Sequence, residues 1–239
     1  MSQIKLGNTD IPFVFRGDEL MYPNYVKDGL VLHYDFSGMT NADTSRGIAK
    51  DLSGNGNHGT LQNFNFTAES GYDKNKLLFD GVDDEILIAS SEPISQMTYL
   101  MTIDISNTEI QFLNSFSIHA YYLRKERTNL HFSIQSDVDG QRGIRQSDVF
   151  SNSTRNKMSI GFILDRLNNQ VELIANGVPL GRASVRDLSP TRITYLGRWV
   201  TKSDSLDGSI LSTHIYNRVL TPEEIAHNYA IEKERFGIE

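Results

Sequence analysis

The chain has 239 residues, of which 38% are hydrophobic and 22% charged, a composition typical of globular proteins. Its formal net charge of −7 argues against nucleic acid as the main partner, because phosphate binding needs a positive field. The lack of cysteine excludes disulfides, thiolate metal sites and cysteine nucleophiles, and no apolar run approaches the roughly 18 to 20 residues that span a membrane.

Residues 1–28 differ from the rest of the chain. Their short apolar pieces are interrupted by Pro12, Gly17 and Pro23, so the segment cannot close a core of its own. We expect an N-terminal arm that packs on a partner or on the domain. The segment has no charged stretch followed by an apolar one, so we expect no secretory signal. The expected location is then inside cells, or in a particle released without secretion.

Residues 29–219 predict a series of short strands. The clearest is Leu30–Phe36, where large apolar residues recur at every second position, the period of a half-buried strand. Further strands, each bounded by turn residues, are expected at 77–79, 85–89, 99–105, 116–123, 130–135, 158–164, 170–175, 193–196 and 209–216. Many short strands separated by Gly, Asn and Asp predict an all-β fold, either an antiparallel β-sandwich or a barrel.

Three connecting segments carry their own predictions. Asn176-Gly177 should form a two-residue hairpin turn, since both positions tolerate positive φ. Residues 136–154 are polar and without periodicity, which predicts a long, mobile loop. The basic run Arg124–Arg127 is predicted to be a solvated hairpin tip.

Residues 220–239 predict a short C-terminal helix. Thr221 is a strong N-cap, Pro222 suits the first helical position, and Glu224 stands where a capping box needs its acid. Gly237 can end the helix in a left-handed conformation. The helix is expected to pack against the sandwich or the arm.

Gly54–Gly59 fits the G-x-G-x-x-G pattern of dinucleotide-binding proteins. That pattern binds pyrophosphate only between a strand and the start of a helix. The residues that follow are polar and aromatic without a helical period, and strands and helices do not alternate in this chain. The segment is therefore predicted to be a glycine-rich turn.

Several Asp and Asn side chains offer the oxygen ligands that calcium prefers. They are Asp51, Asn55, Asn57, Asp80, Asp83, Asp84 and Asp207. The same residue types also form turns by bonding to nearby backbone, so a structural calcium and plain turns both stay open as interpretations. The adjacent Asp83 and Asp84 would point to opposite faces of a strand. The six histidines lack the spacing of a zinc site.

Trp199, the only tryptophan, follows Arg198 at the end of a predicted strand. An aromatic face can stack on the apolar face of a sugar while neighbouring polar groups bind its hydroxyls. Tyr121 and Tyr122 share a predicted strand, so one of them should face solvent or a partner. Trp199, Arg198, Tyr121 and Tyr122 are thus the predicted carbohydrate-binding residues. The alternative is that Trp199 fills the core edge or an interface.

Five motifs occur in the order found in one family of sandwich domains. They are Gly29–Phe36, Asp51–Leu61, Phe79–Asp84, Ala175–Val178 and Ile215–Ile225. On these motifs, residues 29–227 resemble laminin-G-like domains of the concanavalin A-like lectin fold. The resemblance implies a jelly-roll sandwich that binds glycans or proteins and often holds a structural calcium. Residues 92–157 depart from the pattern, since Met97–Leu100 stands where the family has a tryptophan-bearing strand.

The arm followed directly by this domain is similar to structural proteins of tailed bacteriophages of Gram-positive hosts. The resemblance implies a virion location on the tail, baseplate or fibre, with synthesis in the host cytoplasm and release by lysis. It also implies attachment to other virion proteins through the arm, and we expect a homo-oligomer. Host wall glycan is the expected ligand, and neither nucleic acid nor a membrane is expected as partner.

The leading functional hypothesis is a non-enzymatic virion protein whose sandwich contacts host-surface glycan. One alternative is an architectural decoration or cement protein that binds no sugar, and another is a degenerate wall-glycan hydrolase. Hydrolases among the relatives carry Glu-x-Asp-x-Glu on one strand, and here Thr102, Asp104 and Ser106 take those places. Hydrolysis needs two carboxylates about 5 to 10 Å apart. A single one predicts that the protein is not an enzyme.

Overall fold

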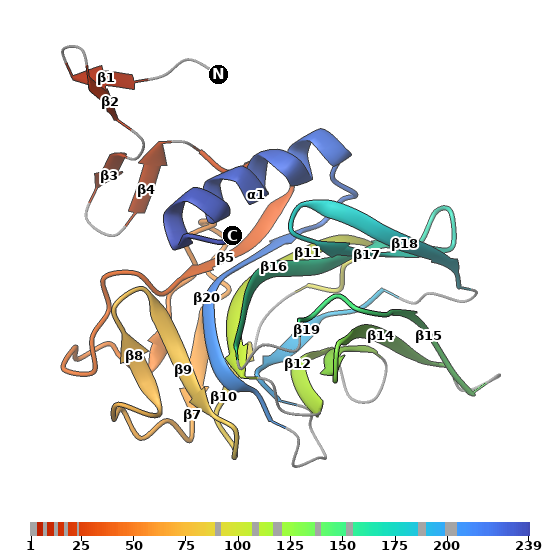
Figure 1. Ribbon diagram of the computed structural model, residues 1–239, viewed down its shortest axis with the longest axis horizontal. Helices are drawn as coiled ribbons and strands as arrows, with labels where there is room; N and C mark the ends of the chain where they lie inside the picture. Colours follow the sequence, from red (N-terminus) through yellow and green to blue (C-terminus); the bar gives the residue numbers. More distant parts are fainter. Residues whose placement is uncertain are drawn as a thin grey trace.

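Two antiparallel sheets face each other and a helix covers the outer side of one of them (Figure 1). The computed structural model describes residues 4–6, 9–11, 14–16, 19–22, 24–88, 92–106, 110–116, 121–136, 140–151, 155–185, 190–198 and 205–239. The predicted all-β sandwich with a C-terminal helix is confirmed. No helix among these residues has the length and apolar character needed to cross a membrane.

The helix-side sheet is the eight-stranded sheet beneath the helix. Its order is β18-β17-β16-β11-β20-β9-β8, with β5 also paired to β20. Its strands are β5 (Leu30–Asp35), β8 (Gly71–Asp73), β9 (Lys76–Asp80), β11 (Gln96–Ser106), β16 (Arg155–Asp165), β17 (Gln170–Ala175), β18 (Val178–Ser184) and β20 (Asp207–Tyr216). The first strand of the sandwich therefore pairs with the last.

The far sheet also has eight strands, in the order β15-β14-β13-β12-β19-β10-β7-β6. These are β6 (Ile48–Ala49), β7 (Gly59–Gln62), β10 (Glu85–Ile88), β12 (Ile110–Phe116), β13 (Tyr121–Glu126), β14 (Asn129–Ser136), β15 (Gly140–Gln146) and β19 (Ile193–Leu196). The main core lies between the two sheets.

Strand β11 is buried on both faces, which explains its nearly continuous apolar sequence. Tyr99, Met101 and Ile103 point into the core between the sheets. Leu100 points the other way and packs with Ile225 of the helix α1 (Pro222–Phe236). The helix thus gives the sandwich a second, smaller apolar layer.

Helix α1 begins and ends as its sequence predicts. Thr221 accepts a hydrogen bond from the Glu224 N–H, the Glu224 side chain bonds back to the Thr221 backbone, and Pro222 occupies the first turn. Gly237 closes the helix with a φ of 62°. The hairpin turn at Asn176-Gly177 is also confirmed, because both residues have positive φ.

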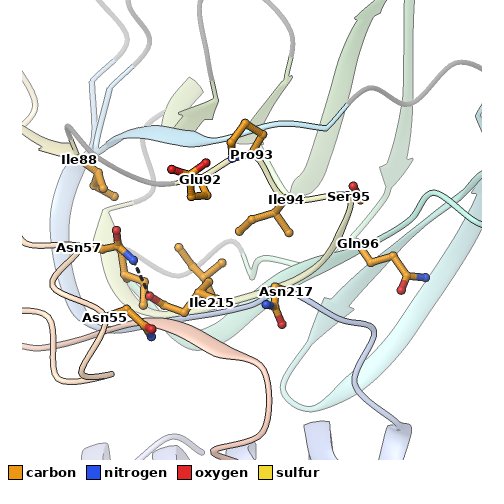
Figure 2. Close-up of a pocket in the computed structure, with 12 residues that line it drawn as sticks. Asn55, Asn57, Ile88, Glu92, Pro93, Ile94, Ser95, Gln96, Ile215 and Asn217 are labelled. Carbon is orange, nitrogen blue, oxygen red and sulfur yellow. Dashed lines mark hydrogen bonds between the residues drawn. The ribbon is translucent and has the colours of Figure 1, made fainter.

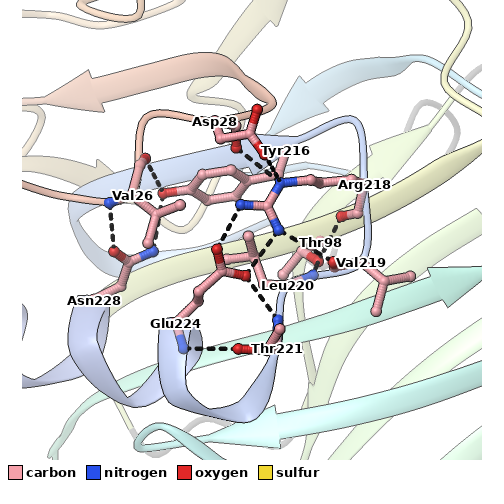
Figure 3. Close-up of polar contacts among 10 residues, drawn as sticks. All are labelled: Val26, Asp28, Thr98, Tyr216, Arg218, Val219, Leu220, Thr221, Glu224 and Asn228. Atoms are coloured by element: carbon pink, nitrogen blue, oxygen red, sulfur yellow. Dashed lines mark hydrogen bonds and ion pairs between the residues drawn. The ribbon is translucent and has the colours of Figure 1, made fainter.

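Arg218 fixes the start of α1 on the sheet (Figure 3). Its guanidinium forms two bonds of 2.7 and 2.8 Å with the Glu224 carboxylate and lies 2.9 Å from the Asp28 carboxylate. The Thr98 hydroxyl donates to the Arg218 carbonyl and accepts from the Leu220 N–H. These bonds join the helix to β11 and to the segment before β5.

The N-terminal segment forms two hairpins outside the sandwich, near α1 in Figure 1. Strands β1 (Ile4–Leu6) and β2 (Thr9–Ile11) pair with each other, as do β3 (Val14–Arg16) and β4 (Glu19–Tyr22). Residues 24–28 behave differently. Tyr25 is buried against α1, and the Val26 N–H donates to the Asn228 side chain. The end of the predicted arm is therefore part of the packed domain.

Two strand predictions were wrong. The single strand expected at 116–123 is divided between β12, which ends at Phe116, and β13, which begins at Tyr121. The long loop expected at 136–154 contains the edge strand β15. Only one side of β15 has a strand partner, and its polar sequence lacks the alternation that marks a half-buried strand.

The predicted basic hairpin tip was also wrong for most of its residues. Only Arg127 lies in the turn, while Arg124 and Lys125 belong to β13. Lys125 is buried with its Nζ 5.7 Å from the centre of the Phe150 ring, and burial lowers the pKa of its amine. The pairing of β13 within the sheet places the Lys125 side chain inside the protein, which the charge of the segment did not predict.

Candidate functional site

A pocket of about 540 Å³ opens between the two sheets at one end of the sandwich. Its apolar wall is formed by Val31, Leu32, Ile88, Pro93, Ile94 and Ile215. Its polar lining is formed by Asn55, Asn57, Glu92, Ser95, Gln96 and Asn217. Figure 2 shows Ile94 and Ile215 pointing into the cavity from opposite walls. The pocket therefore combines a buried apolar floor with side-chain amides at its rim.

The turn at residues 51–58 positions two of these amides, and Asp51 holds that turn. One oxygen of the buried Asp51 carboxylate accepts from the N–H groups of His33 and Ser53, at 3.0 and 2.9 Å. The other accepts from the Ser53 hydroxyl and the Asn57 N–H, at 2.8 and 2.9 Å. The predicted glycine-rich turn is thus a rigid loop attached to β5.

Two asparagine side chains of this turn are fixed by the edge of β5. The Asn57 amide Nδ2 donates to the Val31 carbonyl at 2.8 Å, and the Asn55 Nδ2 donates to the Leu30 carbonyl at 3.0 Å. Gly56, with a φ of 75°, lets the chain reverse between them. The orientation of both amides is therefore set before any ligand arrives.

The opposite rim comes from residues 92–96 and the end of β20. The Gln96 Nε2 donates to the Asp165 carboxylate at 3.2 Å. The backbone of Ile94 is held by two hydrogen bonds to Thr191, at 2.7 and 3.0 Å. Among the described residues that line the pocket, Glu92 alone carries an ionisable side chain, and it is exposed.

Of the predicted carbohydrate-binding residues, Arg198 is described and lies away from the pocket. Arg198 follows β19, with its Nη1 3.6 Å from the carboxylate of Glu85, the first residue of β10. The pocket is at the other end of that strand, where Ile88 lines it. Trp199 lies outside the described residues, so its stacking role stays a prediction.

The two tyrosines of the predicted site are in β13. Tyr121 pairs with Phe116 and Ile134 in the sheet. The Tyr122 side chain is only 3% exposed, and its ring contacts that of Phe112 edge-on, with centres 5.3 Å apart. In this position Tyr122 offers no open face to a sugar, and it does not line the pocket.

The candidate calcium ligands fall into separate groups. Asp80, Asp83 and Asp84 each place an oxygen within 4.8 Å of the others. Asp83 and Asp84 lie in the turn before β10 and not on a strand, so the alternation of strand faces does not apply to them. Burial raises the pKa of the Asp84 carboxyl to about 6. The Asp51 oxygens are already occupied by four protein donors.

Strand β11 is the one compared above with glycoside hydrolases, and its one carboxylate, that of Asp104, forms ion pairs. The Asp104 oxygens lie 2.9 Å from Arg155 and 3.6 Å from Lys76. The hydroxyl of Thr102 donates to Glu232, and that of Ser106 donates to Asp207 at 2.6 Å. No second carboxylate comes from this strand, so the two-carboxylate arrangement of a glycosidase is absent from it.

A buried group of titratable residues lies between α1 and the helix-side sheet. His33 and His214 stand opposite each other on β5 and β20, with ring centres 4.3 Å apart. Burial lowers the pKa of each imidazole to about 3, and for His33 the neighbouring His214 adds to this. Arg235 of α1 lies 2.6 Å from the Asp35 carboxylate. Spacing along the sequence gave no sign of this group.

Glu232 connects the same group to α1. Its carboxylate accepts hydrogen bonds from the hydroxyls of Tyr25, Thr102 and Ser212. The Tyr25 hydroxyl also accepts from Arg235 at 2.7 Å. Burial, with the neighbouring Glu232 carboxylate, holds the pKa of Tyr25 well above its usual value. The space that the described residues leave beneath the helix is about 10 Å³, too small for a ligand, which favours a structural role for the group.

No family model and no curated protein sequence matches the chain. Among solved structures, the ligand-binding domain of botulinum neurotoxin serotype D in complex with N-acetylneuraminic acid aligns over 86% of this chain and 51% of that chain, with a TM-score of 0.64 and 13% identity. The receptor-binding domain of botulinum neurotoxin D aligns over 86% of this chain and 53% of that one, with a TM-score of 0.63 and 15% identity.

A carbohydrate-binding module of a Ruminococcus gnavus sialidase, bound to α2,6 sialyllactose, aligns over 58% of this chain and 84% of that chain, with a TM-score of 0.48 and 17% identity. At such low identities the toxin domains show that the β-sandwich fold is shared, and no more. The chain spans about half the length of those domains, at 51% and 53%.

Proposed function

We propose that this protein is a non-enzymatic glycan-binding module whose ligand occupies the pocket between the sheets. The observation that carries the proposal is the pairing of an apolar wall with preset side-chain amides around a volume of about 540 Å³. Sugars present both apolar C–H faces and hydroxyls, and pockets that bind them combine apolar surface with a few placed polar groups. A toxin domain of the same fold has been solved with a bound sugar acid, which supports the class of ligand.

The test is to fill the pocket. Ile94→Trp adds bulk to a half-buried side chain on the wall, while its backbone bonds to Thr191 remain available. We expect binding on a glycan array to fall about tenfold or more, the loss of about 1.4 kcal/mol of affinity. Leu167→Trp is the matched control, because Leu167 is 79% exposed in the turn after β16. Equal binding by both variants would place the ligand elsewhere and contradict the proposal.

The sequence-based prediction of a phage virion location stays a prediction. So does its alternative, an architectural cement protein that binds no sugar. A glycan-binding module presented on a host-recognition particle is consistent with the proposed function. If no glycan binds and the protein assembles with virion components, the cement alternative is favoured.

A structural calcium also stays a prediction. Asp80, Asp83 and Asp84 are the described residues best placed to hold one, because three carboxylate oxygens lie close together there. Calcium should then raise the melting temperature, EDTA should reverse the rise, and Asp83→Asn should remove it. A melting temperature that is the same in calcium and in EDTA would contradict a calcium site.

A further inference from the structure

We infer that the pocket accepts uncharged, hydroxyl-rich sugars and rejects acidic sugars such as sialic acid. This inference rests on the proposed function and specifies its ligand. It depends on how the side-chain amides of the rim are oriented and on which charged residues line the cavity.

The orientation of three amides follows from their partners. The Asn55 and Asn57 Nδ2 atoms face the carbonyls of Leu30 and Val31, and a carbonyl oxygen only accepts. Each amide must therefore place its NH₂ toward the backbone and its oxygen on the other side. Figure 2 shows the Asn57 oxygen on the side of the amide away from this bond.

The Gln96 amide is also oriented by an acceptor. Its Nε2 faces the carboxylate of Asp165, which at neutral pH only accepts, and a hydrogen bond from Gln96 is among the causes that lower the pKa of this carboxyl. Asn55 commits its NH₂ twice, since it also donates to the Ser53 hydroxyl oxygen at 3.0 Å. Of the eight amide N–H groups on Asn55, Asn57, Gln96 and Asn217, four donate to these protein acceptors, and the Asn57 oxygen is left on the side away from its bond.

The charges of the residues that line the pocket also favour a neutral ligand. Among the described residues that line the pocket there is neither lysine nor arginine, and the one ionisable residue is the acid Glu92. A sugar carboxylate entering here would lose water, would gain no cationic partner from these residues, and would face Glu92. The hydroxyls of a neutral sugar would instead donate to the amide oxygens, while its C–H face lies on Ile94 and Ile215. The lining thus matches a ligand that donates hydrogen bonds and carries no negative charge.

The experiment is a glycan array in which each neutral oligosaccharide is paired with the same oligosaccharide capped by sialic acid. Lactose and α2,6 sialyllactose are one such pair. We expect the full-length protein to bind neutral members about tenfold or more tightly than their capped partners. Ile94→Trp should lose this binding and Leu167→Trp should keep it.

A second variant tests the cause of the selectivity. Asn217 is exposed at the rim, so Asn217→Arg adds a cationic donor without disturbing the core. We expect it to narrow the preference for neutral sugars several-fold, while Leu167→Arg, which adds the same charge to the exposed turn after β16, leaves that preference unchanged. An equal preference in both variants would show that rim charge does not set the selectivity and would overturn the inference.

A failure of this inference can be distinguished from a failure of the proposed function. Preferential binding of sialylated glycans that Ile94→Trp abolishes would overturn this inference and leave the proposed function standing. An array on which no glycan binds would overturn both, as would binding of any kind that Ile94→Trp does not weaken.

Discussion

His33 and His214 are two bases held neutral inside the protein. Their stacked rings lie between β5, β20 and the underside of α1, and the groups that face them include Tyr25, Asp35, Glu232 and Arg235. A charged imidazole here would lose its water and meet a second imidazole, so the folded state resists protonation.

We predict that this pair makes the fold sensitive to acid. The pKa of each histidine is about 3 in the folded protein, against 6.5 for an ordinary histidine, so between these values the unfolded chain binds more protons. Stability must therefore rise with pH across this window and fall as the pH drops below 6.5. The expected slope is about 1.4 kcal/mol per pH unit for each histidine.

Urea unfolding at a series of pH values measures this slope. His214→Gln should remove about half of it, because one of the two buried bases is then gone. Asp35 adds a separate loss at lower pH: burial raises the pKa of its carboxyl, but Arg235 opposes this and the net pKa is lowered. A wild-type unfolding free energy that stays constant from pH 6.5 down to about 4 would contradict the prediction.

At the scale of elements, the N-terminal hairpins and the sandwich are separable. The hairpins β1–β2 and β3–β4 pair only within themselves, and an isolated two-stranded hairpin is marginally stable in water. The packed domain begins at residue 24, since the Asn24 carbonyl bonds to His227 and Tyr25 is buried.

We therefore predict that deleting residues 1–23 leaves the melting temperature of the domain nearly unchanged. The sequence predicts an arm that attaches to partners and, separately, a homo-oligomer; if the arm also joins the copies, the same deletion should convert an oligomer into a monomer in light scattering. It should also weaken binding to a dense glycan surface while leaving single-site affinity intact, because linked sites gain effective concentration. Deletion to residue 28 is the contrast, since it also removes Tyr25 and should destabilise the fold. An oligomer that survives the shorter deletion would contradict the arm prediction.

Local signals in the sequence predicted the elements that depend on neighbouring residues. Thr221, Pro222 and Glu224 define the start of α1 within four positions of the chain, and Asn176-Gly177 defines a turn in two. By contrast, β15 could not be recognised from its polar sequence, because its place is set by pairing with β14. An alternating apolar pattern indicates that one face of a strand is buried, and an edge strand shows little of this alternation.

The pocket could not be predicted from the sequence either, because only the fold brings its lining residues together. Asn55 and Asn57 stood out in the sequence, but as turn residues and calcium ligands. Their role at a rim becomes visible only when the fold brings them to Glu92 and Asn217. Conversely, Tyr122 was one of the predicted sugar-binding residues because one of two adjacent tyrosines on a strand should face outward, and of this pair Tyr122 is buried against Phe112.

At the scale of the whole molecule, the cores of the sandwich and of the helix layer share one sheet. Strand β11 contributes Tyr99 to one and Leu100 to the other, so neither layer can be removed without exposing the other. The pocket lies where the two sheets separate, at the ends of β10 and β20, and its floor is part of the main core. The candidate site is thus built on the rigid part of the fold.

The pairing of β5 with β20 has a consequence for how the protein is made. During synthesis, Leu30–Asp35 leaves the ribosome long before Asp207–Tyr216, so the helix-side sheet lacks β20 until its other described strands have been made. Contacts this distant in sequence slow folding, to milliseconds or seconds in β-rich domains. The nascent chain therefore carries unpaired strand edges until β20 emerges, and its yield in a cell should depend on chaperones that shield such edges.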